Sequence, residues 1–413
     1  MTKIEARYTK RACYFTYLAS ASLFSLPPIL FAAFKEMYGI SYTLLGTLVL
    51  INFCIQLGID LIFSFFSKHF NIHKTIRLMP LITALGMCIY ALIPTFFPQY
   101  AYAGLVIGTL VFSVAAGLGE VLISPTVAAL PSDNAERDMS ALHSLYGYGV
   151  IGVVIIGTLF IKLVGRQYWM YLTLAFAVMP VIASILLTVA KLPDFNMEKN
   201  KSTAATSKHN IKSLILCVMC IFLGACAEST MTNWISTYAE NALDIPKIWG
   251  DIFGMAFFAM LLALTRSTYA KYGKNISRVL MIGMVGSAVC YVAVAVLSNA
   301  VLSLIACAAV GVFTAMLWPG TLILMEEKVK GVGVAAYALM AAGGDFGASF
   351  APQTLGIIVD KISVAKWAKT IGDALSLTSE QIGFKIGMLM AAIFPILGAF
   401  LLLYMKKHFK KEN

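Results

Sequence analysis

Apolar runs of about 20 residues follow one another along almost the whole sequence, and each is long enough to cross a bilayer as a helix. In the hydrocarbon core the backbone must be helical, because no water is present to satisfy its polar groups. Of the 413 residues, 60% are hydrophobic and 12% are charged, whereas an ordinary soluble domain is about a quarter charged. The sequence therefore predicts an all-α membrane protein.

Twelve transmembrane helices can be placed on these runs. The first six are expected at 12–34, 42–66, 76–96, 101–123, 139–161 and 168–190. The second six are expected at 213–236, 250–268, 279–297, 300–324, 332–357 and 383–405. The predicted domains are thus a six-helix bundle at 1–190, a cytoplasmic linker at 191–212 and a second six-helix bundle at 213–413. A polar stretch around Trp367 is expected to form a short interfacial helix.

The two halves carry a matched signature. Gly117–Pro125 lies on the fourth expected helix and Gly311–Pro319 on the tenth, with the same spacing between glycine and proline. This indicates two pseudo-symmetric halves, as in transporters built from parallel repeats. Glu120 stands in the first copy where Thr314 stands in the second, so the halves share a scaffold and differ in chemistry.

Glycines extend the repeat to the fifth and eleventh expected helices. Gly149 and Gly152 have the same three-residue spacing as Gly344 and Gly347, which suggests that they correspond in that order. Small residues allow helices in a membrane to approach closely.

The distribution of basic residues predicts the orientation. With both termini in the cytoplasm, 23 of the 31 Lys and Arg residues lie on the inner side, as the positive-inside rule expects. The basic residues expected outside are Lys35, Lys162, Arg166, Lys247, Lys361, Lys366, Lys369 and Lys385. The net charge of +11 then reflects orientation and contact with membrane lipids, and no nucleic-acid partner is expected. We expect a monomeric multi-pass protein of the bacterial inner or plasma membrane.

Apart from Asp251 at the start of one span, four acids fall inside the expected spans, and an acid costs about 3 kcal/mol to insert at a helix centre. A polar central cavity explains them most economically. Glu120, Glu228 and Asp345 are the predicted proton-coupling residues, and Asp60 and Arg266 are predicted to be gating or structural residues. A packing pair of Glu120 with a neighbouring histidine is the alternative for that carboxylate.

Amides and aromatic rings near these acids suggest a hydroxylated ligand. The predicted substrate-binding residues are Asn52, Gln56, His143, Tyr146, Asn233, Trp234 and Trp318. Trp318 precedes Pro319, where a broken helix would expose the ring to the cavity. Trp234 has an alternative role as an aromatic anchor in the outer leaflet. No metal or cofactor is expected.

Two halves of six helices resemble the major facilitator superfamily, although Lys68 stands where that superfamily's signature has an acid. Glu120-x4-Pro125, Leu130-Pro131 and Leu142–Gly149, with the seventh expected helix, resemble the fucose–proton symporter family of sugar permeases. That resemblance implies that Glu120 belongs to a proton and sugar site, and it matches His143 and Tyr146 to the family's Gln and Asn. The family's acid in the first helix is absent here.

The sequence thus predicts a secondary active transporter of a small polar solute, a sugar in the first instance, that works by alternating access and is coupled to protons. An exporter of drugs or metabolites on the same fold and an uncoupled uniporter are the alternatives. A non-transporting membrane sensor would need a soluble signalling domain, and the polar stretches are too short for one. No motif of an intramembrane enzyme is present, so no enzymatic activity is expected.

Overall fold

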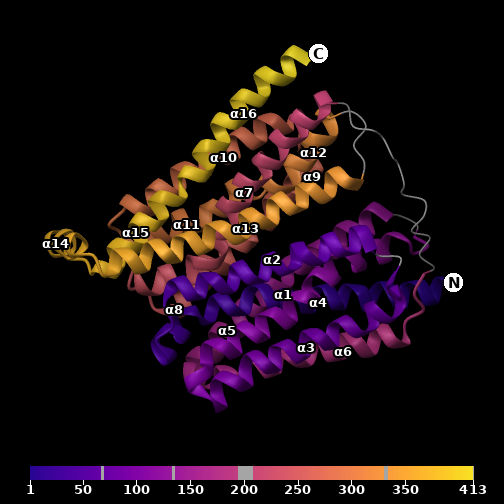
Figure 1. Cartoon of the computed structure of the whole chain (residues 1–413), viewed down its shortest axis with the longest axis horizontal. Coiled ribbons are helices and arrows are strands. Elements are labelled where there is room, and N and C mark those ends of the chain that lie inside the picture. The colour runs from indigo at the N-terminus through magenta and orange to yellow at the C-terminus, as the bar shows by residue number, and fades with distance from the viewer. Residues whose placement is uncertain (67–68, 133–134, 194–207, 330–333, 413) are drawn as a thin grey trace. The chain divides into compact units, whose positions relative to one another are not determined.

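The computed structural model of the chain describes residues 1–66, 69–132, 135–193, 208–329 and 334–412 (Figure 1). These described residues form helices and no strand, which confirms the predicted all-α fold. Among them, ten helices are long and apolar enough to cross a membrane. α5 (Ala135–Leu163) and α13 (Val334–Ser363) occupy the two remaining expected spans.

The chain divides into two compact units. The first comprises Met1–Gly39 and Ile51–Asn200, and the second comprises Ile40–Leu50 and Lys201–Asn413. The first eleven residues of that second unit therefore include the beginning of α2, which the sequence had placed in the first bundle. Most of the expected linker, at 194–207, lies outside the described residues.

The helices of the first unit are α1 (Lys3–Tyr38), α2 (Tyr42–Phe66) from Ile51 onward, α3 (Ile72–Phe96), α4 (Ala101–Ala128), α5 (Ala135–Leu163) and α6 (Trp169–Val189), with the 3-10 turns η2 (Pro98–Tyr100) and η3 (Arg166–Tyr168). α1 begins with a capping box, because Thr2 and Glu5 each bond the other's backbone N–H. α1 packs against α4, α5 and α6, and α3 packs against α4 and α6.

The helices of the second unit are α7 (Lys208–Asn241), α8 (Lys247–Trp249), the π-helix η5 (Gly250–Ala256), α9 (Phe257–Tyr272), α10 (Ile276–Val296), α11 (Ala300–Thr314), α12 (Leu317–Lys328), α13 (Val334–Ser363), α14 (Lys366–Leu375), α15 (Ser379–Ala391) and α16 (Ile393–Glu412). α7 packs against α11, α12, α13, α15 and α16, and α10 packs against α11, α12, α15 and α16. These pairings correspond to those of α1 and α3 in the first unit, as expected of a repeat.

The tenth expected span is broken, as the sequence predicted near Pro319. α11 ends at Thr314 and α12 begins at Leu317. Proline has no N–H to donate to the carbonyl four residues earlier, so the Ala315 carbonyl lacks a helical partner. By contrast, α1 runs unbroken through Pro27 and Pro28.

The predicted correspondence of the glycines is wrong in register. A Cβ on Gly149 would lie 2.8 Å from the Leu18 carbonyl oxygen of α1. Gly343 and Gly347 face α7. A Cβ added to Gly343 would lie 3.2 Å from the Val218 carbonyl oxygen, and one added to Gly347 would lie 2.3 Å from the Phe222 carbonyl oxygen. Gly344 instead lies against the Trp318 ring, 2.3 Å from an added Cβ. Sequence spacing alone could not tell which glycine of each pair faces the neighbouring backbone.

The polar stretch around Trp367 contains the expected short helix, α14, which packs beside α15 (Figure 1). Trp367 is about half exposed, and Ala368 and Gly372 are the buried residues of the helix. Trp367, Ile371 and Leu375, four residues apart, form an exposed apolar stripe, which is typical of a helix that lies at a membrane interface.

Candidate functional site

The predicted amides Asn52 and Gln56 lie where α2 meets α4 in the first unit. The Ser113 hydroxyl donates to Asn52 Oδ1 at 2.7 Å, and Gln56 Nε2 donates to the Asn52 carbonyl at 3.3 Å. A Cβ added to Gly117 would lie 3.2 Å from Gln56 Cα, so this glycine permits the close approach of the two helices. Both amides are buried and engaged in these bonds.

Glu120 lies on the same helix as Ser113, two turns further on, and its side chain is exposed. Asp60 of α2 is near enough for the two carboxylates to interact electrostatically. Tyr17 of α1 is also close to Glu120 and hydrogen-bonds Ser124. Asp60 Oδ1 is buried and has no hydrogen-bond partner within the described residues. Three helices of the first unit thus bring two carboxylates and a phenol together.

The polar centre of the second unit is an ion pair between α7 and α9. Arg266 Nη2 donates to both carboxylate oxygens of Glu228, at 3.1 and 3.2 Å. Arg266 Nε donates to the Ala315 carbonyl at 2.8 Å, which is the carbonyl that Pro319 leaves without a helical donor. The guanidinium therefore joins α7, α9 and the break between α11 and α12.

The other predicted residues of the second unit are mostly buried. Asn233 Nδ2 donates to the Ser229 carbonyl at 2.9 Å, and Asp345 is 5% exposed on α13. Trp234 is fully buried, and its indole N–H donates to the Pro352 carbonyl at 3.0 Å. Trp318 is half-buried against Gly344. The structure thus explains Trp234 as a packing residue, and it places Trp318 next to the helix that carries Asp345.

The side chains of His143 and Tyr146, on α5, lie outside the described residues. That they lie beside Glu120, on the next helix along the chain, therefore stays a prediction.

Residues 12–352 match the sequence profile of the Major Facilitator Superfamily. The chain belongs to this superfamily. It is accordingly a multi-pass membrane transporter and not an enzyme. The superfamily match does not test the finer resemblance to the fucose–proton symporters. No match was found among curated proteins.

Solved structures of other major facilitator transporters have the same fold. A bacterial homologue of the human lysosomal transporter Spinster matches with a TM-score of 0.77 and 12% identity, over 100% of this chain and 99% of that one. The xylose transporter XylE from E. coli matches with a TM-score of 0.74 and 12% identity, over 97% and 99%. The nucleoside transporter NupG matches with a TM-score of 0.67 and 14% identity, over 98% and 99%.

Sequence reasoning missed a polar cluster around the first turn of α2 in this transporter. The Asp360 carboxylate accepts the backbone N–H groups of Tyr42 and Thr43, at 3.1 and 2.6 Å. The Tyr42 hydroxyl donates to Glu380 at 2.5 Å and accepts from Asn241 at 2.6 Å. A carboxylate at a helix N-terminus satisfies otherwise unpaired donors. The signal that the sequence offered for this cluster was that its residues stand near the ends of predicted helices.

A second missed cluster surrounds Lys247, which the sequence assigned only to the outer positive charge. Its ammonium donates to Ser236 Oγ at 2.8 Å and lies 3.3 Å from Asp251 and 3.8 Å from Glu240. The Lys247 side chain is 8% exposed. A buried lysine needs such partners, and the π-helix η5 carries Asp251 to it.

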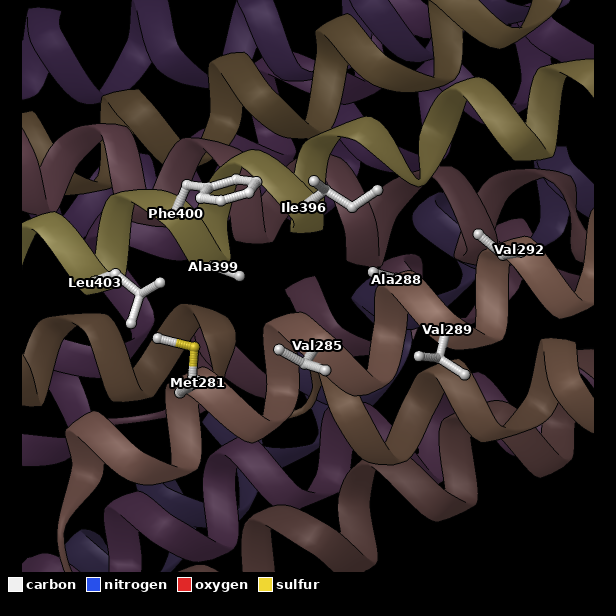
Figure 2. A pocket seen from close by; sticks show the side chains of 9 residues that line it. All are labelled: Met281, Val285, Ala288, Val289, Val292, Ile396, Ala399, Phe400 and Leu403. Carbon is white, nitrogen blue, oxygen red and sulfur yellow. The ribbon is translucent and has the colours of Figure 1, made fainter.

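An apolar groove of about 470 Å³ runs between α10 and α16, and no predicted site residue lines it (Figure 2). Its lining includes Val285 and Val289 on one helix and Phe400 and Leu403 on the other. Exposed apolar side chains on a transmembrane helix suit contact with lipid tails. Within the described residues, no group of three His, Cys, Asp or Glu side chains could hold a metal ion.

Proposed function

We propose that this transporter carries a small hydroxylated solute of the sugar type together with protons, by alternating access. The observation that supports the coupling most is Glu120, an exposed carboxylate eight residues before the end of α4 with Asp60 and Tyr17 beside it. An exposed acid at this depth is costly unless it faces water. Glu120 is therefore proposed to take up and release the coupled proton from a water-filled path.

A hydroxylated solute is proposed from the kinds of side chain available. Asn52, Gln56 and Asn233 supply amides, and Trp318 supplies an aromatic ring. The amides are engaged in internal hydrogen bonds, so solute binding would exchange some of those bonds for solute hydroxyls. The similarity in fold to xylose and nucleoside transporters supports the same class of solute.

His143 and Tyr146 are proposed to complete the site, because the resemblance to the fucose–proton symporters matches them to polar residues of that family. Glu228 and Asp345 are proposed as the further acids of the coupling path. We also propose that the protein is a monomer in a bacterial plasma membrane, with both termini in the cytoplasm, since most basic residues then lie inside.

Purified protein in proteoliposomes tests this function. Labelled monosaccharides and sugar acids would be supplied outside, with an inward proton gradient, and their accumulation followed with and without a protonophore. We expect accumulation above the outer concentration that collapses when the protonophore is added. Equal uptake in both conditions would contradict proton coupling, and no uptake of any compound would contradict the proposed solute class.

A further inference from the structure

The Arg266 guanidinium has an edge that its internal contacts do not use. It carries five N–H groups. Nε is directed to the Ala315 carbonyl and Nη2 to the Glu228 carboxylate. Within the described residues, no hydrogen bond is recorded for Nη1. The two N–H groups of Nη1 are therefore free to bind an additional acceptor.

The pair is also accessible. The Arg266 side chain is 40% exposed and the Glu228 side chain 22% exposed, whereas Trp234 and Tyr238, further along α7, are fully buried. Arg266 lies six residues before the end of α9 and three residues before the end of the apolar span Lys247–Tyr269. An arginine near the end of a span can reach the interface. This one is instead turned to Glu228 and to the Ala315 carbonyl while its side chain stays partly exposed, which marks it as a candidate binding group.

We propose that Arg266 binds a carboxylate group of the transported solute, and that Glu228 is the internal competitor for the same guanidinium. This inference rests on the proposed transport function and names the chemistry of its solute, a hydroxylated acid. The planar fork of a guanidinium matches a carboxylate with two parallel hydrogen bonds. Glu228 occupies only one nitrogen of this fork, because both of its oxygens accept from Nη2.

Charge balance links this binding to a proton. The pair of Arg266 and Glu228 is neutral overall, and a bound carboxylate would add one negative charge at membrane depth. Protonation of Glu228 restores neutrality and frees the guanidinium for the solute. One proton would therefore be taken up with each solute anion.

Few other charges can take part in this exchange. Arg266 is the charged group that pairs with Glu228. The other charged side chains described on α7, α9 and α12 stand near the ends of those helices: Lys212, Glu240, Lys271, Glu326, Glu327 and Lys328. On α13, Asp345 is mid-helix and 5% exposed, and Asp360 accepts the backbone N–H groups of Tyr42 and Thr43.

Two matched pairs of probes test the inference on the full-length protein in detergent. Glucuronate and glucose differ mainly in a carboxylate against a hydroxymethyl group, and so do galacturonate and galactose. We expect the sugar acids to raise the melting temperature at concentrations about tenfold lower than the neutral sugars, since a charge-assisted pair contributes more than a neutral hydrogen bond. Lowering the pH should strengthen the response to the acids until the acids themselves become protonated.

Variants separate the binding role from folding. Arg266→Lys keeps the charge and loses the fork, so the acid response should weaken about tenfold or more. Glu228→Gln keeps Arg266 and removes its competitor, so the acids should still bind, with much less dependence on pH. Lys271→Gln, an exposed cation on the same helix, is the control and should behave like the parent.

The outcomes distinguish this inference from the proposed function. If neutral sugars stabilise the protein and sugar acids do not, the anion site is wrong and the sugar-type transporter stands. If Arg266→Lys or Glu228→Gln responds to acids and pH like the parent, Arg266 is not the binding group. If no probe of either class stabilises the parent protein, both the inference and the proposed solute class are contradicted.

Discussion

The acids within the apolar helices have different partners in the two units. In the first, Glu120 and Asp60 lie close to each other, and no ion pair is recorded for either within the described residues. In the second, Glu228 is held by a guanidinium through two hydrogen bonds. The Asp60 and Glu120 carboxylates repel each other when both are charged, whereas the charge of Glu228 is balanced by that of Arg266.

The difference indicates a division of labour on one repeated scaffold. The matched Gly–Pro signatures lie on α4, which runs unbroken through Pro125, and on α11–α12, which is broken before Pro319. In the second unit, the carbonyl freed by Pro319 is used to orient Arg266. We infer that the first unit binds a proton at Glu120 without an anion, whereas the second unit binds the solute anion together with the proton that Glu228 takes up.

The largest expected effect is that of Glu120→Gln on active transport. The substitution keeps the size of the side chain and removes its titration, so accumulation against a gradient should be lost while exchange down a gradient remains. Binding and protonation are thermodynamically linked, so loss of one coupled proton removes the driving force without removing the path. Counterflow and gradient-driven uptake measured on the same proteoliposomes check this.

His143→Gln is the matched comparison, because it introduces the residue of the fucose–proton symporters. It should be milder than Glu120→Gln. If Glu120→Gln accumulates solute like the parent, the proton must pass by Asp60, Glu228 or Asp345, or the transporter is uncoupled or uses another ion.

The next largest effect is expected at a glycine contact in the second unit. A Cβ at Gly344 would lie 2.3 Å from the Trp318 ring, so Gly344→Ala should lower the free energy of unfolding by about 1–3 kcal/mol. Gly152→Ala, on α5 with no atom within 4 Å of its added Cβ, should be neutral or stabilising by up to about 1 kcal/mol. Unfolding of both variants in detergent, measured against the parent, gives the difference. Equal destabilisation would argue against this packing of Trp318.

A smaller difference in stability is expected between variants that neutralise an acid in one unit and in the other. Glu228→Gln leaves Arg266 without its charged partner and should cost about 1–2 kcal/mol, a value reduced because the pair is partly exposed. Asp60→Asn removes repulsion with Glu120 and should be neutral or slightly stabilising. Melting temperatures of the two variants at neutral pH check the contrast. A larger loss for Asp60→Asn would reveal a cationic partner of Asp60 and would contradict the division of labour.

Length and hydrophobicity were enough to predict the fold, because each span must satisfy its own backbone in lipid. The break near Pro319 could also be predicted, since it follows from a missing N–H. The partner of Arg266 could not be predicted, because Glu228 is 38 positions away in the sequence and the contact depends on how α7 and α9 pack. The register of the glycines, the buried position of Trp234 and the cluster of Asp360 with Tyr42 depend in the same way on helix rotation and tertiary contact.

Proton uptake that accompanies solute entry tests the central claim most directly. Proteoliposomes containing a pH-sensitive dye would receive glucose, galactose, glucuronate or galacturonate outside, with no imposed proton gradient and with the membrane potential clamped. The account predicts acidification of the vesicle interior when a transported solute is added. With Glu120→Gln it predicts none for glucose and galactose, because Glu228 takes up a proton only with an anion. Entry of labelled solute into parent vesicles without a change in internal pH would contradict it.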